Sequence, residues 1–386
     1  MAFVMFSFPY KARILIRKGW RSLAVVLWVM HCASAMATSV AFINPGKAGE
    51  HYWTLSAERM EQAARQLGMR LEVLNAERNH FKALALVRQL AERRPEDRPQ
   101  YVVMTNDYGV GPEILRLLDG KGIFVFMAFS ALHGPVRAEI GPPRGRYSFW
   151  LGSLEPQAEE AGYQTAQALI RRARAAQKHS GSDAALQLLS IAGDRSTPSS
   201  MARNAGMRRA VAEAGDVQLL QEVYGGWNED KAREQARWLF ARYPGARLLW
   251  AGNDLMAFGA MEAWRERGGM PGVDGFFSGV NSSPEALARL RNGELTALSG
   301  GHFMTGAWAM VMLYDHSRGV DFASEGLEQQ HPLFISFDKD SAERYEKLMR
   351  HPATAVDFRQ FSKVLNPRVK RYNFATELWL HGKGRE

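Results

Sequence analysis

The feature that most constrains the fold is a regular alternation of short β-rich runs and amphipathic helical stretches that begins at Ser39. The runs "SVAFI", "RLEVL", "YVVM" and "GIFVFM" are each 4–6 residues long and apolar. Between them, apolar residues recur at helical spacing, for example over 55–67 and 81–93, and "GPEILRLLDG" predicts a further helix. Strands that alternate with helices in this way predict a parallel sheet covered by helices on both faces.

The alternation stops at the Gly- and Pro-rich stretch "LHGPVRAEIGPPRGR" and then restarts. In "SSPEALARLRNG" a Ser cap, Pro284 and Gly293 mark the start and end of one helix. The second run also ends on an apolar segment, "LFISF", and a helical tail. We therefore expect an α/β protein with two doubly wound parallel-sheet lobes. The elements predicted for the second run are "YSFWLG", helix 157–176, "ALQLLSIAG", helix 200–214, "VQLLQEV", helix 229–242, "ARLLWAG", a helix from 254, "GFFSGV", "ELTALS" and helix 303–317.

Residues 1–37 have the composition of a secretory signal peptide. They contain five bases and no acid, followed by the apolar run "LAVVLWVM" and the small residues "ASAMA", which predicts cleavage after Ala35 or Ala37. An uncleaved anchor is the alternative. Loss of the five bases lowers the formal net charge from +9 to +4, so the basic composition does not indicate a nucleic-acid partner. The single cysteine, Cys32, is also lost, which suits an oxidising compartment such as the periplasm.

Aromatic, amide and carboxyl side chains recur just after the predicted strands. In open parallel sheets these positions share one edge, where ligands bind. Sugars combine C–H faces that pack on aromatic rings with hydroxyls that need directional hydrogen bonds. Each residue also has a structural alternative: Asp254 as a helix cap, Trp53 and Trp227 as core residues, His302 as a satisfied buried histidine. The candidate ligand-binding residues are Glu50, Tyr52, Trp53, Asn106, Asp107, Trp227, Asn253, Asp254 and His302.

Three segments resemble the type I periplasmic binding proteins, which bind sugars and autoinducers and share their fold with the effector domains of LacI-type repressors. "NDLMAFGA" at 253–260 is similar to the family's Asn-Asp-x-Met-Ala-x-Gly motif. "SMARNAGMRRAV" at 200–211 is similar to its Ser-x-x-Arg-x-x-Gly-Phe helix, and "YWTL" follows the first strand as in the family. The resemblance covers about residues 38–340.

The resemblance implies two lobes that are joined by a three-strand hinge and close on a ligand. We expect the crossovers near 130–147, 298–302 and 318–334. The first lobe would then comprise 38–130 plus about 300–320, and the second 131–299 plus about 330–345. Residues 346–386 would form a C-terminal tail that packs on a lobe or on a partner.

The resemblance also implies roles for single residues. Tyr52 and Trp53 correspond to the aromatic pair that stacks on the ligand from the first lobe, and Trp227 to the stacking aromatic of the second. Asp254 corresponds to the acid that bonds ligand hydroxyls. Asn106 and Asp107 lie where the family often has a polar contact.

The chain departs from the family pattern at two positions. Met201 stands where sugar-binding members often carry an arginine that contacts the ligand. Phe129 stands where they often carry an acid. Both changes make the predicted pocket less polar, which argues against a simple pentose or hexose.

The function predicted first is a monomeric, non-catalytic binding protein of the periplasm. It would close on a small polar, sugar-like ligand and present it to a membrane partner, either an ABC permease or a sensor receptor. The alternatives are an enzyme and a repressor-type effector domain. No nucleophile elbow, P-loop, dinucleotide fingerprint or paired-Cys metal spacing supports catalysis, a cofactor or a metal. A basic leader stands where a repressor would have its helix-turn-helix.

Overall fold

The computed structural model describes residues 37–180, 185–350 and 356–376. The predicted signal peptide lies outside them except for Ala37. None of the helices in the described ranges has the length and apolar character needed to cross a membrane.

The first lobe is built on a six-stranded parallel sheet with the order β11-β5-β4-β3-β1-β2. Its long apolar runs form the strands because both faces of the sheet are covered. The strands are β1 (Ser39–Asn44), β2 (Arg70–Asn75), β3 (Tyr101–Met104), β4 (Phe124–Ala128), β5 (Trp150–Pro156) and β11 (Glu328–His331).

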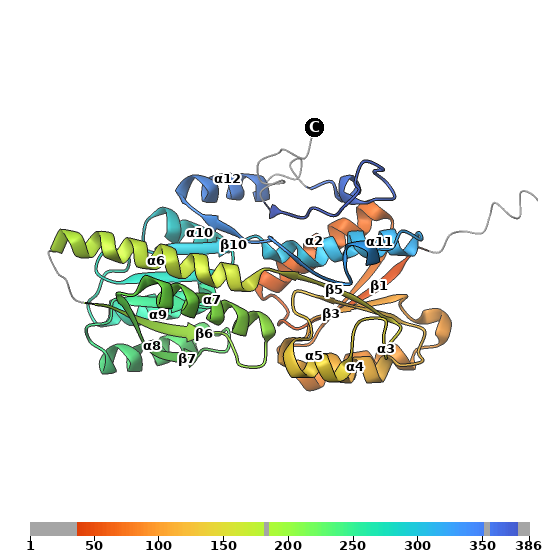
Figure 1. Cartoon of the computed structure of the whole chain (residues 1–386), viewed down its shortest axis with the longest axis horizontal. Helices are drawn as coiled ribbons and strands as arrows, with labels where there is room; N and C mark the ends of the chain where they lie inside the picture. Colours follow the sequence, from red (N-terminus) through yellow and green to blue (C-terminus); the bar gives the residue numbers. More distant parts are fainter. Residues whose placement is uncertain (1–36, 181–184, 351–355, 377–386) are drawn as a thin grey trace, which may run out of the picture. The chain divides into compact units, whose positions relative to one another are not determined.

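Helices cover the two faces of this sheet separately (Figure 1). Alternate residues of β1 show the division: Phe42 packs with α2 and α11, whereas Ala41 and Ile43 pack with α3 and α4. The helices of this lobe are α2 (His51–Leu67), α3 (His80–Glu92), α4 (Gly111–Leu118), α5 (Gly134–Ile140) and α11 (Thr305–Ser317), with short 3-10 turns η1 (Pro95–Asp97), η2 (Asp107–Gly109), η3 (His302–Met304) and η4 (Ala323–Glu325).

The second lobe repeats this plan with the strand order β12-β10-β9-β8-β6-β7. Only β12 is antiparallel to its neighbour. Helices α6 and α7 cover one face, and α8, α9 and α10 the other. The elements are β6 (Leu186–Ala192), β7 (Val217–Tyr224), β8 (Leu248–Ala251), β9 (Phe276–Val280), β10 (Ala297–Gly300), β12 (Ile335–Phe337), α6 (Ala158–Ser180), α7 (Pro198–Ala214), α8 (Glu229–Arg242), α9 (Asp254–Glu266), α10 (Pro284–Arg291) and α12 (Lys339–Arg350).

The two-lobe α/β fold predicted from the alternation is confirmed, but the first crossover lies elsewhere than we expected. β5 pairs with β4 and β11 in the first sheet, whereas the sequence analysis assigned residues 131–299 to the second lobe. The chain therefore leaves the first sheet between β5 and α6. The Gly- and Pro-rich stretch before β5 holds the short helix α5 and a loop, and this break in the alternation is not a lobe boundary.

The chain passes between the lobes at two further places. The chain returns to the first lobe between β10 and α11, and enters the second again between β11 and β12. The strand β11 was not predicted, because its sequence "EQQH" carries no apolar residue. Its neighbour β5 supplies a free edge with which β11 forms backbone hydrogen bonds. This strand therefore forms because it pairs with β5, and not because of its own hydrophobic pattern.

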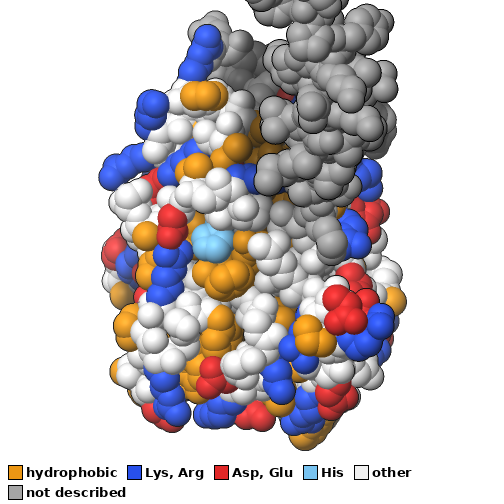
Figure 2. All heavy atoms as spheres, turned by 90° about the vertical axis from the view of Figure 1, so that its right-hand side faces the viewer, with side chains coloured by type: hydrophobic (Ala, Val, Ile, Leu, Met, Phe, Trp, Pro, Cys, Tyr) orange, Lys and Arg blue, Asp and Glu red, His pale blue; other side chains and the backbone are white. Residues whose placement is uncertain are grey.

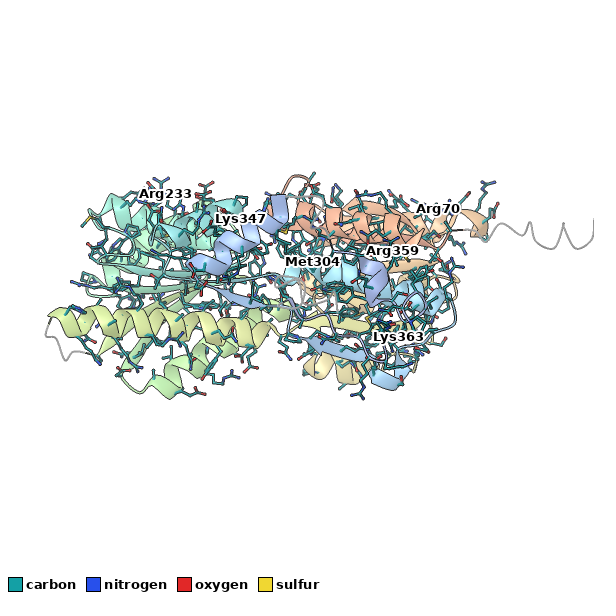
Figure 3. The ribbon with its side chains drawn as sticks, turned by 90° about the horizontal axis from the view of Figure 1, so that it is seen from above. Arg70, Arg233, Met304, Lys347, Arg359 and Lys363 are labelled. Atoms are coloured by element: carbon teal, nitrogen blue, oxygen red, sulfur yellow. The ribbon has the colours of Figure 1, made fainter. Side chains whose placement is uncertain are left out.

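The C-terminal part of the chain crosses between the lobes once more. α12 packs on α10, where Arg291 pairs with Glu346 at 2.6 Å. Residues 356–376, with the turn η6 (Phe358–Phe361), lie against α2 and α11 of the first lobe. Seen from above, Lys347 therefore lies over the second lobe, and Arg359 and Lys363 lie over the first (Figure 3).

The surface of the first lobe carries charges of both signs. On the end face that Figure 2 shows, Lys and Arg side chains are interspersed with Asp and Glu side chains wherever described residues form the surface. Charged side chains of this lobe also form ion pairs, such as Arg93 with Glu72 at 2.7 Å. The basic residues of this face therefore do not gather into one positive patch.

Candidate functional site

A pocket lies where the carboxyl ends of both sheets meet. Its empty volume, counted out to the opening, is about 540 Å³. Seven of the nine predicted residues line it: Glu50, Tyr52, Trp53, Asp107, Trp227, Asn253 and His302. The other lining residues are Arg78, Phe129, Pro156, Thr197, Ser199, Arg203 and Asn281.

The first lobe contributes an aromatic wall to this pocket. Trp53 meets Tyr52 and Phe129 edge-on, with ring centroids 4.9 Å and 5.2 Å apart. Trp53 is only 6% exposed and also belongs to the hydrophobic core, so the core and ligand-site predictions for it both describe its position. Gly46 lies against this indole, and a Cβ there would come within 2.2 Å of Trp53 Cδ1. The loop after β1 thus holds the Trp53 ring in place, because Gly46 lets the indole pack directly against the backbone of the loop.

The second lobe contributes Trp227, which Asp194 holds in place. The Trp227 indole Nε1 donates to Asp194 Oδ2 at 2.8 Å. The same carboxylate accepts hydrogen bonds from the backbone and hydroxyl groups of Ser196 and Thr197. Burial acts to raise the pKa of Asp194, but these hydrogen bonds lower it below the usual value. Asp194 therefore remains a charged anchor that fixes the ring.

Arg203 and His302 form a buried polar pair between the lobes. Arg203 Nη1 donates to the Gly252 carbonyl at 2.8 Å, and Nη2 lies 3.0 Å from His302 Nε2. Burial lowers the pKa of Arg203 to about 10, so the guanidinium stays charged near neutral pH. His302 Nε2 must then accept, which places its proton on Nδ1. Burial and the Arg203 charge lower the pKa of His302 well below its usual value, which agrees with a neutral ring.

Two donors of this pair have no partner among the described residues. They are Arg203 Nε and His302 Nδ1, on side chains that are 5% and 3% exposed. The His302 ring is stacked between Tyr52, at 4.8 Å, and Phe334, at 4.3 Å. Because both residues line the pocket, their free N–H groups are suited to ligand oxygen atoms.

Two acidic residues of the first lobe differ in their surroundings. Glu50 is paired with Arg78, whose Nε donates to Glu50 Oε2 at 2.9 Å and whose Nη1 reaches the Tyr108 hydroxyl. Asp107 forms no such ion pair within the described residues. Burial raises the pKa of Asp107 to about 6. Asp107 therefore titrates close to neutral pH, whereas Glu50 is held at the rim by a cation.

Asp254 lines a neighbouring cavity and not the central pocket. This cavity has an empty volume of about 780 Å³ and shares Glu50, Tyr52, Asn253, Asn281 and His302 with the pocket. Asp254 Oδ1 accepts from Asn281 Nδ2 at 2.9 Å and from its neighbour's backbone N–H at 3.0 Å. The helix cap of α9 is Asn253, which accepts from the Met256 N–H. Asn253, and not Asp254, therefore caps the helix. Burial raises the pKa of Asp254.

Asn106 is the second predicted residue outside the central pocket. Its Nδ2 donates to the Ala131 carbonyl at 3.1 Å, and its Oδ1 accepts from the Gly111 N–H at 2.9 Å. The side chain thus ties the β3 loop to the β4 loop and to the start of α4.

Strained backbone is concentrated at the site. Seven non-glycine residues of the described ranges have positive φ, and four of them line the pocket: Arg78, Phe129, Trp227 and Asn281. Each follows a strand of its sheet. Such conformations cost about 1–3 kcal/mol each and persist where surrounding contacts enforce them. The strand-end loops are therefore held in the shape that presents these side chains.

The described residues offer hydrogen-bonding and stacking chemistry. Among them, no three His, Cys, Asp or Glu side chains are grouped so that they would hold a metal ion. The sequence analysis did not name seven of the lining residues as candidates, Arg203 among them, nor Asp194, which acts through Trp227. Two of these missed residues, Asp194 and Arg78, could have been found from the sequence. Their position after β6 and β2, at the same sheet edges as the predicted residues, is the pattern that would have indicated them.

Comparisons with known proteins agree with this geometry. The family model described as "Periplasmic binding protein domain" matches residues 40–321. A search of the curated proteins finds no match. A periplasmic sugar-binding protein from Pseudomonas fluorescens is 40% identical in sequence, with a TM-score of 0.79 over 89% of this chain and 99% of the other.

Two more distant structures share the fold. The periplasmic component of the arabinose ABC transporter from Shewanella sp. ANA-3, bound to L-arabinofuranose, is 19% identical, with a TM-score of 0.65 over 80% of this chain and 95% of the other. An ABC transporter solute-binding protein from Actinobacillus succinogenes 130z, with bound D-allose, is 16% identical, with a TM-score of 0.67 over 79% and 99%. The family match covers more than half of the chain, and the Pseudomonas protein is similar over nearly all of it. The chain therefore belongs to the type I periplasmic binding protein family.

Proposed function

We propose that this protein is a periplasmic solute-binding protein that closes its two lobes around a sugar-like ligand and delivers it to an ABC permease. The observation that carries the proposal is the pocket at the two sheet edges, to which both lobes contribute aromatic rings and polar groups. Tyr52, Trp53 and Trp227 supply faces for the C–H surfaces of a sugar ring. Arg203 and His302 supply unpartnered donors for its oxygen atoms.

The position of His302 supports ligand-linked closure. It lies on the crossover between β10 and α11, it stacks on Tyr52 of the first lobe, and it bonds Arg203 of the second. A ligand oxygen bound by His302 Nδ1 would therefore favour the arrangement in which both lobes hold this ring. Hinge closure of this type is how two-domain binding proteins enclose their ligands.

The proposal includes export through the predicted signal peptide, and no catalytic step. Residues 1–37 would be removed on export, so the protein recovered by osmotic shock should begin at Met36 or Thr38. An intact N-terminus on a membrane-bound protein would instead support the uncleaved anchor. Turnover of any bound sugar by the pure protein would contradict the non-catalytic assignment.

Ligand binding is tested by a thermal-shift and calorimetry screen against pentoses, hexoses and polyols. A ligand at about 100 times its dissociation constant stabilises the folded state by about 2.7 kcal/mol, which raises the melting temperature by a few degrees. Trp227→Ala should abolish binding with the fold retained, because Trp227 lines the pocket. Asp254→Ala should weaken binding less, because Asp254 acts on the pocket only through the Asn281 amide that it holds. Trp238→Ala is the matched control, because Trp238 is 71% exposed on α8 and lies outside the pocket. Wild-type affinity in both site variants would contradict the site assignment.

A further inference from the structure

The C-terminal segment 356–376 ends against the connections between the lobes. Its last residue, Thr376, is fully buried and donates from Oγ1 to the Leu333 carbonyl at 2.7 Å. Leu333 lies on the crossover between β11 and β12. Thr376 Cγ2 also packs at Gly301, on the crossover between β10 and α11, where a Cβ would come within 2.7 Å of it. One side chain of the segment therefore contacts two of the crossovers.

The residues that follow these two contacts belong to the ligand site. Gly301 precedes His302, which lines the pocket, and Leu333 precedes Phe334. The His302 and Phe334 rings stack on each other, with centroids 4.3 Å apart. On each crossover, the contact with Thr376 is therefore one residue away from a ring of this stack.

The segment that carries Thr376 is firmly attached to the first lobe. Glu325 of η4 accepts a hydrogen bond from the Tyr372 backbone N–H at 2.8 Å. The Phe374 ring stacks on Trp308 of α11, with centroids 4.9 Å apart. Both attachments lie within four residues of Thr376. The Thr376 side chain is therefore held at a defined place on the first lobe, from which it contacts the crossovers.

The orientation of the His302 ring decides where its free donor points. His302 Nδ1 has no partner among the described residues, and the ring is stacked between Tyr52 and Phe334. A movement of the backbone at Leu333 would shift the Phe334 ring, and the His302 ring that rests on it would turn. Hydrogen bonds weaken steeply when the donor points away from the acceptor. A turned ring would therefore bind a ligand oxygen less well.

We propose that Thr376 is a positioning residue of the ligand site. By holding the two crossovers at Gly301 and Leu333, it fixes the His302 ring in the orientation that binds a ligand oxygen. The C-terminal segment thus sets the ligand affinity although it does not line the pocket. This proposal rests on the proposed sugar-binding function.

Isothermal titration calorimetry on protein purified from cells that express the full chain tests the proposal with D-galactose, L-arabinose, D-glucose and D-allose. For the sugar that binds, Thr376→Val keeps the side-chain shape but loses the hydroxyl, and should weaken binding at least about fivefold. Thr376→Ser keeps the hydroxyl, and its affinity should stay within about twofold of wild type. Tyr372→Phe is the matched control, because it removes a buried hydroxyl of the same segment that bonds Asp315 of α11 and not a crossover. Its affinity should also stay within about twofold.

A double-mutant cycle separates positioning from a general effect on the fold. In the His302→Gln background, Thr376→Val should weaken sugar binding by less than about twofold, because the ring through which Thr376 acts is already absent. A purely structural role of Thr376 would give the same loss in both backgrounds.

NMR of the ligand-free protein with 15N-labelled histidine tests the ring directly and needs no sugar. His302→Gln assigns the two ring nitrogens, which in the wild type should show a neutral ring protonated on Nδ1. Thr376→Val should shift both signals, whereas Thr376→Ser and Tyr372→Phe should leave them in place.

The outcomes separate the two proposals. Unshifted His302 signals in Thr376→Val, wild-type sugar affinity in that variant, or an equal loss in both backgrounds of the cycle would overturn the positioning role and leave the sugar-binding function intact. Shifted His302 signals in a protein that binds none of the sugars would support the positioning of the ring and contradict the proposed function.

Discussion

At the scale of single residues, burial raises the pKa of Asp107 and lowers the pKa of His302. The two residues therefore make the free energy of unfolding depend on pH in opposite directions. It raises the pKa of Asp107 to about 6, so the folded state keeps a proton that the unfolded chain releases near pH 3.8. It lowers the pKa of His302, so the unfolded chain binds a proton below pH 6.5 that the folded state does not. In the wild-type protein these two contributions partly cancel in mildly acidic solution.

Asp107→Asn should make the protein more stable above pH 6. Below pH 3.8 the Asp107 carboxyl is protonated in both states and contributes no difference. As the pH rises from 3.8 to 6, only the unfolded chain ionises, so the wild-type free energy of unfolding falls by roughly 3 kcal/mol and then stays lowered. Urea denaturation between pH 4 and 8 measures the gap between variant and wild type. A gap that does not widen between pH 4 and 6 would show that Asp107 has an ordinary pKa.

His302→Gln should remove one cause of the decrease in the free energy of unfolding that the wild-type protein shows in acid. The wild-type contribution from His302 is fully present above pH 6.5 and decreases as the pH falls below it, by up to about 1.4 kcal/mol per pH unit. Gln offers an oxygen to accept the Arg203 hydrogen bond but does not titrate. The same denaturation series should show a flatter acid limb for the variant. Equal acid limbs for variant and wild type would mean that His302 is protonated in the folded protein.

The sequence located seven of the pocket-lining residues because strand ends of parallel sheets share an edge. It could not separate Asp254 from that group, since Asp254 is adjacent in sequence to Asn253, which lines both cavities, and yet lines the neighbouring cavity alone. Asp194 and Arg78 were missed because their roles come from partners far along the chain, Trp227 and Glu50.

At the scale of elements, the contact between α6 and α7 positions Arg203. The two helices pack backbone to backbone at two glycines: a Cβ on Gly162 would come within 1.9 Å of the Arg203 carbonyl oxygen, and one on Gly206 within 1.9 Å of the Glu159 carbonyl oxygen. Since backbone atoms form these contacts, a side chain could be accommodated only if the helices moved apart.

Gly206→Ala should therefore lower both stability and ligand affinity. Ala normally favours a helix over Gly by about 1 kcal/mol, so any net loss reports the clash with α6. We expect a loss of about 2 kcal/mol or more in urea denaturation, as for other overpacked sites, and weaker ligand binding because Arg203 shifts. Ala205→Gly on the exposed side of α7 is the control and should cost only about 1 kcal/mol, with affinity retained. A Gly206→Ala protein as stable as wild type would contradict the close packing.

Helices with strong local sequence signals could be predicted, and those with weak signals could not. α10 was predicted from its cap, proline and terminal glycine, and Ser283 does accept the hydrogen bond from the Ala286 N–H. α5 was missed because it is seven residues long, and its Gly and Pro residues predict a loop. The position of the first crossover could not be predicted from the local sequence pattern. It depends on the sheet to which β5 belongs, and this is decided by the strand with which β5 pairs.

At the scale of the whole molecule, the C-terminal segment is joined to the first lobe by a buried carboxylate. Asp315 of α11 is fully buried and accepts hydrogen bonds from the Ser362 and Tyr372 hydroxyls and from the Lys363 N–H. Phe358, Phe361 and Phe374 surround Trp308 of the same helix, with ring centroids 4.7–5.2 Å away. The sequence left open whether this tail packs on a lobe or on a partner, and residues 356–376 pack on the first lobe.

Tyr372→Phe should lower the free energy of unfolding by about 1–3 kcal/mol, because it leaves the buried Asp315 carboxylate with one donor fewer. Leu365→Ala is the control, since Leu365 is 43% exposed, and its substitution should change stability by less than about 1 kcal/mol. Urea denaturation of both variants measures the difference. Equal stabilities of Tyr372→Phe and wild type would show that the tail contributes little to the folded state.

The end of the described tail also touches the connections between the lobes. Thr376 Oγ1 donates to the Leu333 carbonyl at 2.7 Å, and the Thr376 side chain lies where a Cβ on Gly301 would be, so one residue contacts two of the crossover segments. For anyone who builds a biosensor from this protein, that position decides where labels belong. A fluorophore or fusion domain attached just after Thr376 would restrain the hinge. A label at Met270 or Val273, which are exposed on the second lobe, would report the motion of that lobe without restraining the hinge.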